Sequence, residues 1–132
     1  MSRVCLTTLW AAVMMAAVSA AGAQGPIHKT TLQDQPFPAP YHTTTVRTVL
    51  DAGVDAPPHT HPGVEMAYII AGQATIAVQG QPLLTVGPGD SFAIPAGTIH
   101  SVHNFGPGAL TIVSTYIVKS GEPVSSPAGP GR

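Results

Sequence analysis

Short runs of β-branched and apolar residues, separated by turn residues about every eight to ten positions, constrain the fold of this chain more than any other feature. From His42 onward Thr, Val, Ile and Ala predominate, and no stretch has the apolar period of a long helix. This pattern is typical of an all-β domain. We expect seven short antiparallel strands, at residues 43–50, 64–71, 73–78, 83–86, 90–94, 99–105 and 110–118.

So many short strands in about 80 residues predict a closed barrel or a jelly roll, because either architecture hides the sheet edges. Several strands are apolar on both faces, as in residues 66–70 (MAYII). One face would line the interior while the other packs on an opposite sheet or a second subunit. Charged residues make up only 8% of the chain, so we expect a homodimer that covers part of its surface.

The first 23 residues predict a secretory signal peptide. Arg3 gives a positive start, residues 4–18 form an apolar run, and Ala21, Gly22 and Ala23 are the small residues that precede a cleavage site. The apolar run is shorter than the about 20 residues of a membrane span, and no stop-transfer segment follows. We therefore expect a periplasmic or secreted protein that is free of the membrane after cleavage, with a retained N-terminal anchor as the alternative.

The barrel is expected to occupy residues 42–119, with less regular segments on either side. Residues 24–41 have three prolines in their last six positions and predict an extended N-terminal arm. Residues 120–132 are rich in Pro, Gly and Ser and predict a disordered tail. His28 and His42, at the start of the chain, are expected to face solvent.

Cysteine content and charge argue against a disulfide-bonded protein and against a nucleic-acid-binding protein. The only cysteine, Cys5, lies inside the predicted signal, so the mature chain would form no disulfide. Without the signal, four Lys or Arg face six Asp or Glu, a net charge of −2 with neutral histidines. Such a chain has no basic face to follow a phosphate backbone, and we expect no nucleic-acid partner.

Two histidines and a glutamate in one segment predict a metal site. His59 and His61 are two residues apart, so their side chains point the same way on a strand. Glu65 shares their parity, although a Pro-Gly pair interrupts the segment between them. His100 is a fourth candidate ligand that only the fold can bring close.

Two segments of the sequence then resemble the two motifs of the cupin superfamily. The first reads Gly53, five residues, His59, one, His61, three, Glu65, six, Gly72; the second reads Gly89, five, Pro95, one, Gly97, two, His100, three, Asn104. The chain looks like a small single-domain bacterial cupin of the quercetin dioxygenase-like type. The resemblance implies a jelly-roll β-barrel and a metal ion held by His59, His61, Glu65 and His100.

Three imidazoles and one carboxylate suit one divalent Fe, Mn, Ni, Zn or Cu ion and are too rich in nitrogen for calcium. Four protein ligands leave two open positions on an ion that prefers six, whereas a structural zinc site is closed at four. An empty cupin barrel is the alternative. His103, a rival ligand, has the wrong parity relative to His100, and Asn104 is expected to have a structural role at the strand end.

The pocket around this site is expected to be apolar. Ala67 and Ile69 share the parity of Glu65, Val102 shares that of His100, and Phe92 and Ile94 or their neighbours would add to the wall. Arg47 and Lys119, the cations of the strand region, cannot be placed at the site from sequence. This composition argues against cupins that hold a strongly anionic substrate, such as sugar-phosphate isomerases.

Two functions remain open. The first is an oxygenase-like enzyme that acts on a small chelating organic substrate, with Glu65 as a proton shuttle. Two other cupin activities fit this sequence less well. Cupin lyases that cleave dimethylsulfoniopropionate have a tyrosine two residues after the metal glutamate, where this chain has Ala67. Oxalate decarboxylases have two cupin domains, whereas this chain has one. The alternative is a non-catalytic module that binds or senses a small ligand. A titratable group beside the metal would favour the enzyme, and Tyr68 and Tyr116 are the candidates.

Overall fold

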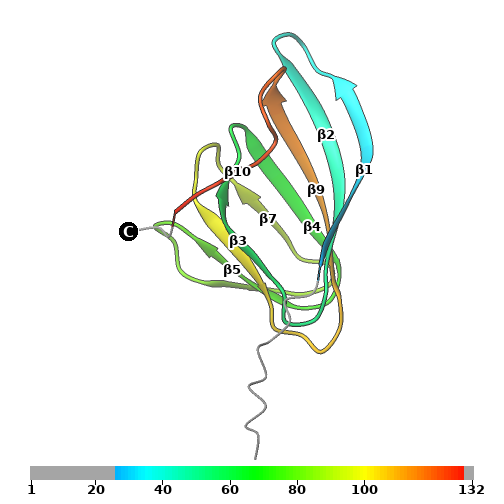
Figure 1. Cartoon of the computed structure of the whole chain (residues 1–132), viewed down its shortest axis with the longest axis vertical. Helices are drawn as coiled ribbons and strands as arrows, with labels where there is room; N and C mark the ends of the chain where they lie inside the picture. Colours follow the sequence, from blue (N-terminus) through cyan, green and yellow to red (C-terminus); the bar gives the residue numbers. More distant parts are fainter. Residues whose placement is uncertain (1–25, 130–132) are drawn as a thin grey trace, which may run out of the picture.

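Two antiparallel five-stranded sheets face each other in residues 26–129, the part of the chain that this computed structural model describes (Figure 1). One sheet has the order β1-β2-β9-β4-β7 and the other the order β10-β3-β8-β5-β6. No helix long and apolar enough to cross a bilayer occurs in these residues. The strands are β1 Ile27–Pro36, β2 Tyr41–Leu50, β3 Asp55–Thr60, β4 Val64–Ala71, β5 Ala74–Val78, β6 Leu84–Val86, β7 Ser91–Ile94, β8 His100–Asn104, β9 Leu110–Lys119 and β10 Ser126–Pro127.

The all-β jelly-roll barrel predicted from the sequence is confirmed. All seven expected strands are present as β2 and β4 to β9, with ends that differ from the expected ones by at most two residues. The predicted signal peptide, residues 1–23, lies outside the described residues.

Three further strands lie outside the seven expected ones: in the predicted arm, between the first two expected strands, and in the predicted tail. The segment 27–36 is extended, as expected of an arm, but it pairs with β2 along its whole length as the edge strand β1. Nine of its ten residues are exposed, so its sequence carries no apolar alternation that would predict a strand. The structure thus makes this segment part of the sheet.

Strand β3 falls between the expected strands 43–50 and 64–71, in a segment that contains two adjacent prolines. Its pairing with β8 is interrupted between Ala56 and His59, where Pro57 and Pro58 have no N–H to donate. The tail also differs from the prediction within the described residues, because β10 pairs with β3 through Ser126 opposite Thr60 and Pro127 opposite His59. Both departures lie beside the predicted metal site.

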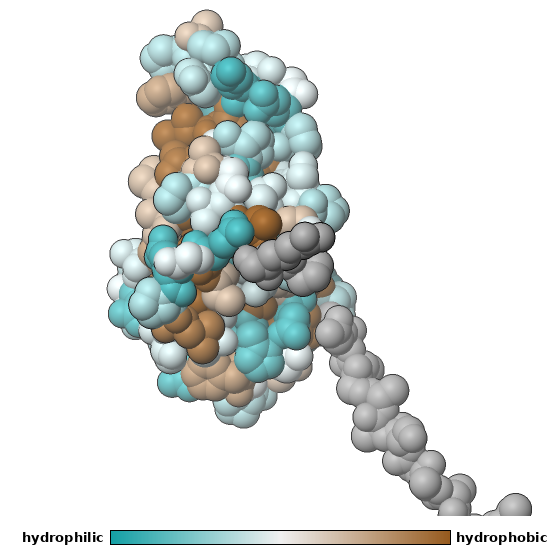
Figure 2. Space-filling model, turned by 90° about the vertical axis from the view of Figure 1, so that its left-hand side faces the viewer, coloured by the Kyte–Doolittle hydropathy of each residue, from teal (hydrophilic) through white to brown (hydrophobic). Residues whose placement is uncertain are grey.

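The barrel interior follows the alternation predicted for the strands. Ala67 and Ile69 on β4, Val102 on β8 and Ile94 on β7 are all buried in the hydrophobic core. The alternate side chains of β4, Met66, Tyr68 and Ile70, are about half exposed on the outer face. Figure 2, which shows another side of the molecule, has its hydrophobic residues in separate patches between hydrophilic ones.

Candidate metal centre

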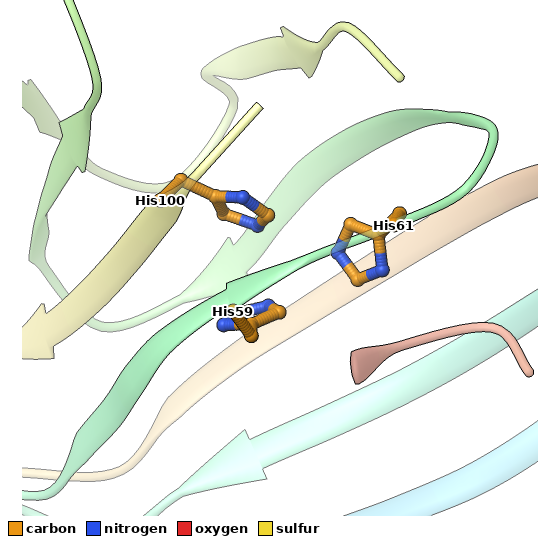
Figure 3. Close-up of side chains that lie close together, drawn as sticks. All are labelled: His59, His61 and His100. Atoms are coloured by element: carbon orange, nitrogen blue, oxygen red, sulfur yellow. The ribbon is translucent and has the colours of Figure 1, made fainter. Parts of the chain in front are cut away.

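Three histidine rings converge on one point inside the barrel (Figure 3). His59 lies near the end of β3, His61 directly follows that strand, and His100 begins β8. Because His59 and His100 are opposite each other in the β3–β8 pair, the strand register brings together residues that are 41 apart in sequence. One nitrogen from each ring lies within 4.8 Å of the other two.

Each ring is fixed by a backbone carbonyl on its outer side. The Nδ1 atom of His59 is 2.8 Å from the Pro57 oxygen, and that of His100 is 3.1 Å from the Thr98 oxygen. His61 Nδ1 is 2.7 Å from the oxygen of Val124, in the C-terminal segment. A carbonyl oxygen only accepts, so each Nδ1 carries the proton and each Nε2 presents a lone pair to the shared centre.

Glu65 reaches the same centre from the opposite sheet. Its Oε2 atom is 3.0 Å from His61 Nε2 and 3.4 Å from His100 Nε2. The turn that precedes it packs tightly, since a Cβ atom on Gly63 would lie 1.7 Å from the carbonyl oxygen of Ile117. Only glycine fits there, and the close approach of this turn to β9 sets the start of β4 and therefore the place of Glu65.

The donor atoms fit a bound cation better than they fit one another. His61 Nε2 is buried and has no hydrogen-bond partner among the described residues. With its proton on Nδ1, this nitrogen and the Glu65 carboxylate would be two electron-rich atoms in contact. Ligand atoms about 2.1 Å from one ion and at right angles to each other lie about 3.0 Å apart. The separations from Glu65 Oε2 to His61 Nε2 and His100 Nε2, 3.0 and 3.4 Å, are close to this value. The residues present therefore fit a transition metal ion.

Electrostatics at the site favour an ionised Glu65 and a neutral His59. Burial alone raises the pKa of Glu65, but the facing groups of His100, His61 and Ser114 outweigh burial and hold that pKa well below its usual range. Burial lowers the pKa of His59, against a smaller opposing effect of its bond to Pro57. A neutral imidazole and an ionised carboxylate are the forms that bind a metal.

Tyr116 on β9 adds a hydroxyl group to the site. Its register position is opposite Glu65, and its OH donates a 3.0 Å hydrogen bond to Glu65 Oε1. Burial, and then the neighbouring carboxylate, raises the pKa of this phenol above its usual range. Tyr68 lies on the exposed face of β4, so Tyr116 is the one of the two candidate tyrosines that contacts the site.

A cavity of about 210 Å³ opens above these groups. His59, Glu65, His100 and Tyr116 line one part of it, and apolar residues including Phe92 and Val102 form the wall, as predicted. Ala67, Ile69 and Ile94 instead pack in the core and do not line the cavity. Pockets for drug-sized ligands measure about 300–1,000 Å³, so this cavity suits a small molecule.

The cavity also takes residues from both ends of the chain, which the sequence did not indicate. Ile27 and Lys29 come from β1, and Ser125 and Pro127 come from the C-terminal segment. Arg47 and Lys119 do not line the cavity, whereas Lys29 does. The position of Lys29 could have been found only by predicting β1, since Ile27 and Lys29 share one face of that strand.

The other polar residues discussed from the sequence lie away from the cavity. His28 is exposed, His42 is partly buried, and neither belongs to the histidine cluster. His103 is exposed on the outer side of β8 and pairs with Asp55. Asn104 is fully buried, and its amide donates to the carbonyls of Leu50, Asp51 and Gly108, which is the structural role we predicted.

Comparison with protein families gives a match to the cupin domain over residues 46–116, just over half of the 132 residues. Among curated proteins, the chain is 36% identical over 56 residues to the dimethylsulfoniopropionate lyase DddQ of Ruegeria pomeroyi. That alignment covers 42% of this chain but only 28% of the lyase.

Solved structures show the same fold. The crystal structure of DddQ from Ruegeria pomeroyi aligns with a TM-score of 0.66 at 23% identity, over 77% of this chain and 51% of the lyase. A double-stranded β-helix protein from Klebsiella pneumoniae aligns with a TM-score of 0.65 at 16% identity, over 82% of this chain and 89% of its own. A cupin superfamily protein from Desulfitobacterium hafniense aligns with a TM-score of 0.61 at 17% identity, over 73% of this chain and 81% of its own.

Proposed function

We propose, starting from the fact that this chain belongs to the cupin family, that it is a metal-dependent enzyme acting on a small chelating organic substrate. One observation carries the proposal. One nitrogen from each of three histidines and a Glu65 carboxylate oxygen converge beside a small cavity, and His61 Nε2 is buried there with no hydrogen-bond partner among the described residues.

We propose His59, His61, His100 and Glu65 as the ligands of one divalent Fe, Mn, Ni, Zn or Cu ion. Bound there, such an ion would supply a Lewis acid with open positions for a chelating substrate or dioxygen. The carbonyls behind the rings keep the three imidazoles in the ligating tautomer. The hydrogen bond from Tyr116 orients the Glu65 carboxylate, and the apolar wall limits the water around the substrate.

Tyr116 favours an enzyme over a non-catalytic binding or sensing module. It supplies a hydroxyl group beside the proposed ligands, within hydrogen-bond reach of Glu65, the residue we propose as proton shuttle. A module that only binds a ligand needs no such group.

A second candidate function is cleavage of dimethylsulfoniopropionate, favoured by the similarity to DddQ. Ala67, at the position where the lyases of this type have a tyrosine, is buried and offers no hydroxyl. Tyr116 is the tyrosine that contacts the site in this chain, from β9 instead of β4. The two candidates differ in their products, and one screen separates them.

The screen uses metal-loaded wild-type protein. Oxygen uptake is followed with a panel of flavonols and catechols, and release of dimethyl sulfide is followed with dimethylsulfoniopropionate. Turnover that is lost in His61→Ala and kept in His103→Ala supports the enzyme, because His103 lies outside the site. Binding of panel members without any turnover would favour the binding module.

We also propose that the protein is secreted or periplasmic and forms a homodimer. For secretion, the mature protein should begin at Gln24, and an unprocessed N-terminus would contradict it. For the dimer, the half-exposed Met66, Tyr68 and Ile70 form an apolar strip on β4. Light scattering should give twice the chain mass for the wild type and the single mass for Tyr68→Glu; a monomeric wild type would contradict the dimer.

A further inference from the structure

Lys29 places a positive charge at the rim of the metal cavity. In the β1–β2 pair Lys29 lies opposite Thr48, and Ile27 lies opposite Leu50; Thr48 and Leu50 are both buried. The alternation of the strand therefore turns Lys29 toward the interior, while His28 and Thr30 face outward. Lys29 remains solvent-exposed and lines the same cavity as Glu65 and His100, so it lies at the open end.

The lysine has no acidic partner in the cavity. Among the described residues, Glu65 is the only acidic one that lines it; its Oε1 accepts a hydrogen bond from Tyr116, and its Oε2 faces His61 and His100 at the proposed metal position. No ion pair of Lys29 occurs among residues 26–129. Its ammonium group is therefore free to pair with a ligand.

The rim lies outside the part of the chain that matches the cupin domain. That match covers residues 46–116 and includes the four proposed metal ligands and Tyr116. Lys29, Ser125 and Pro127 line the cavity from segments before and after it. The rim is thus formed in part by segments outside the matched domain.

We propose that Lys29 determines the substrate class of the proposed enzyme, which is a small organic acid. One end of the molecule chelates the metal, its apolar body lies along Phe92 and Val102, and its carboxylate pairs with the Lys29 ammonium. The cavity of about 210 Å³ leaves space for one ring or a short chain between the two ends. A single lysine without a bidentate guanidinium group suits one carboxylate better than a phosphate ester. This inference rests on the proposed function, because the chelating end requires the metal.

The test compares two probes that differ only in charge, 3,4-dihydroxyphenylacetate and 3,4-dihydroxyphenylacetamide. Their catechol ends chelate a metal equally, and only the acid can pair with Lys29. Calorimetric titration of the metal-loaded wild type should show the acid binding about fivefold more tightly than the amide, as expected for one partly exposed ion pair. In Lys29→Gln the acid should lose this advantage, while the affinity for the amide and the metal content stay unchanged.

Two variants serve as controls. Lys29→Arg keeps the charge and should keep the preference for the acid. Lys119→Gln removes an exposed charge that does not line the cavity and should leave the preference intact. Two results would overturn the inference while leaving the metal site in place. One is an equal preference for the acid in the wild type and in Lys29→Gln. The other is that neither probe binds the metal-loaded protein. A wild type without metal would instead refute the proposed function itself.

Discussion

The C-terminal segment holds a metal ligand in place, and removing it should weaken metal binding in a protein that still folds. His61 Nδ1 donates to the carbonyl oxygen of Val124 at 2.7 Å, and Figure 1 shows this segment passing from the end of β9 across to β3. A chain that ends at Ser120 keeps strands β1 to β9 and loses β10, this acceptor and the other contacts of the C-terminal segment. Its His61 ring would be free to rotate and to change tautomer.

The size of the effect follows from that single hydrogen bond. Loss of an outer partner of a ligating histidine typically weakens metal binding about 10–100-fold, or about 1.4–2.7 kcal/mol. The truncation also removes the bond from Ala128 N to Pro58 O next to His59, which places the expected loss toward the upper part of that range.

The assay is competition for the metal between the protein and a chelator of known affinity at fixed pH. A chain that ends at Gly129 keeps every described contact and should behave as wild type, and so should Val124→Ala, which retains the backbone carbonyl. Far-ultraviolet circular dichroism checks that the shortened chain remains folded. Wild-type metal affinity in a folded chain ending at Ser120 would refute the idea that this segment positions His61.

Three further results are expected. Gly63→Ala should destabilise the fold by about 3 kcal/mol or more in urea unfolding, because the added Cβ would lie 1.7 Å from the Ile117 carbonyl oxygen. Gly87→Ala is the control and should have little effect, because no atom lies within 4 Å of its added Cβ. Equal effects of the two substitutions would contradict the packing argument. Asn104→Ala should lower the free energy of unfolding by about 3 kcal/mol, because it leaves backbone carbonyls and the Gly106 N–H unpaired. His103→Ala, at the neighbouring exposed position, should change it little. An Asn104→Ala variant as stable as the wild type would contradict the structural role of Asn104. The metal-free protein should lose stability as pH falls through 6.5, because His59 takes up a proton in the unfolded state while its lowered pKa keeps it neutral in the folded state. This loss ends below the pKa of His59 in the folded state. In thermal unfolding of the metal-free proteins, the melting temperature should fall less steeply with decreasing pH for His59→Gln than for the wild type.

The parts of the fold that could be predicted from the sequence are those with strong local patterns. Period-two alternation placed the inward faces of β4 and β8, and the two spaced motifs grouped His59, His61, Glu65 and His100 before any geometry was known. The parity of His103 correctly placed it outside the cluster, where it pairs with Asp55. The parity inferences needed only the pleat of a strand, whereas the grouping of His100 with the other three residues came from the resemblance to the cupin superfamily.

The parts that could not be predicted depend on pairing between distant segments. Strand β1 is polar on both faces and is defined only by its hydrogen bonds to β2, so Lys29 could not be placed in the cavity. Strand β10 has two residues, and the contact of Val124 with His61 spans 63 positions of sequence. Tyr116 shares its alternation with buried core residues of β9, and only its register opposite Glu65 distinguishes it from them.

Metal content is the measurement that tests the account most directly. Elemental analysis of wild-type protein purified without added metal or chelator should give about one transition metal ion per chain, and His61→Ala should give almost none. His103→Ala, whose side chain is exposed outside the cavity, should retain the wild-type content. A metal-free wild type that also fails to take up any of the five metals on reconstitution, or a His61→Ala variant with full occupancy, would contradict the proposed centre.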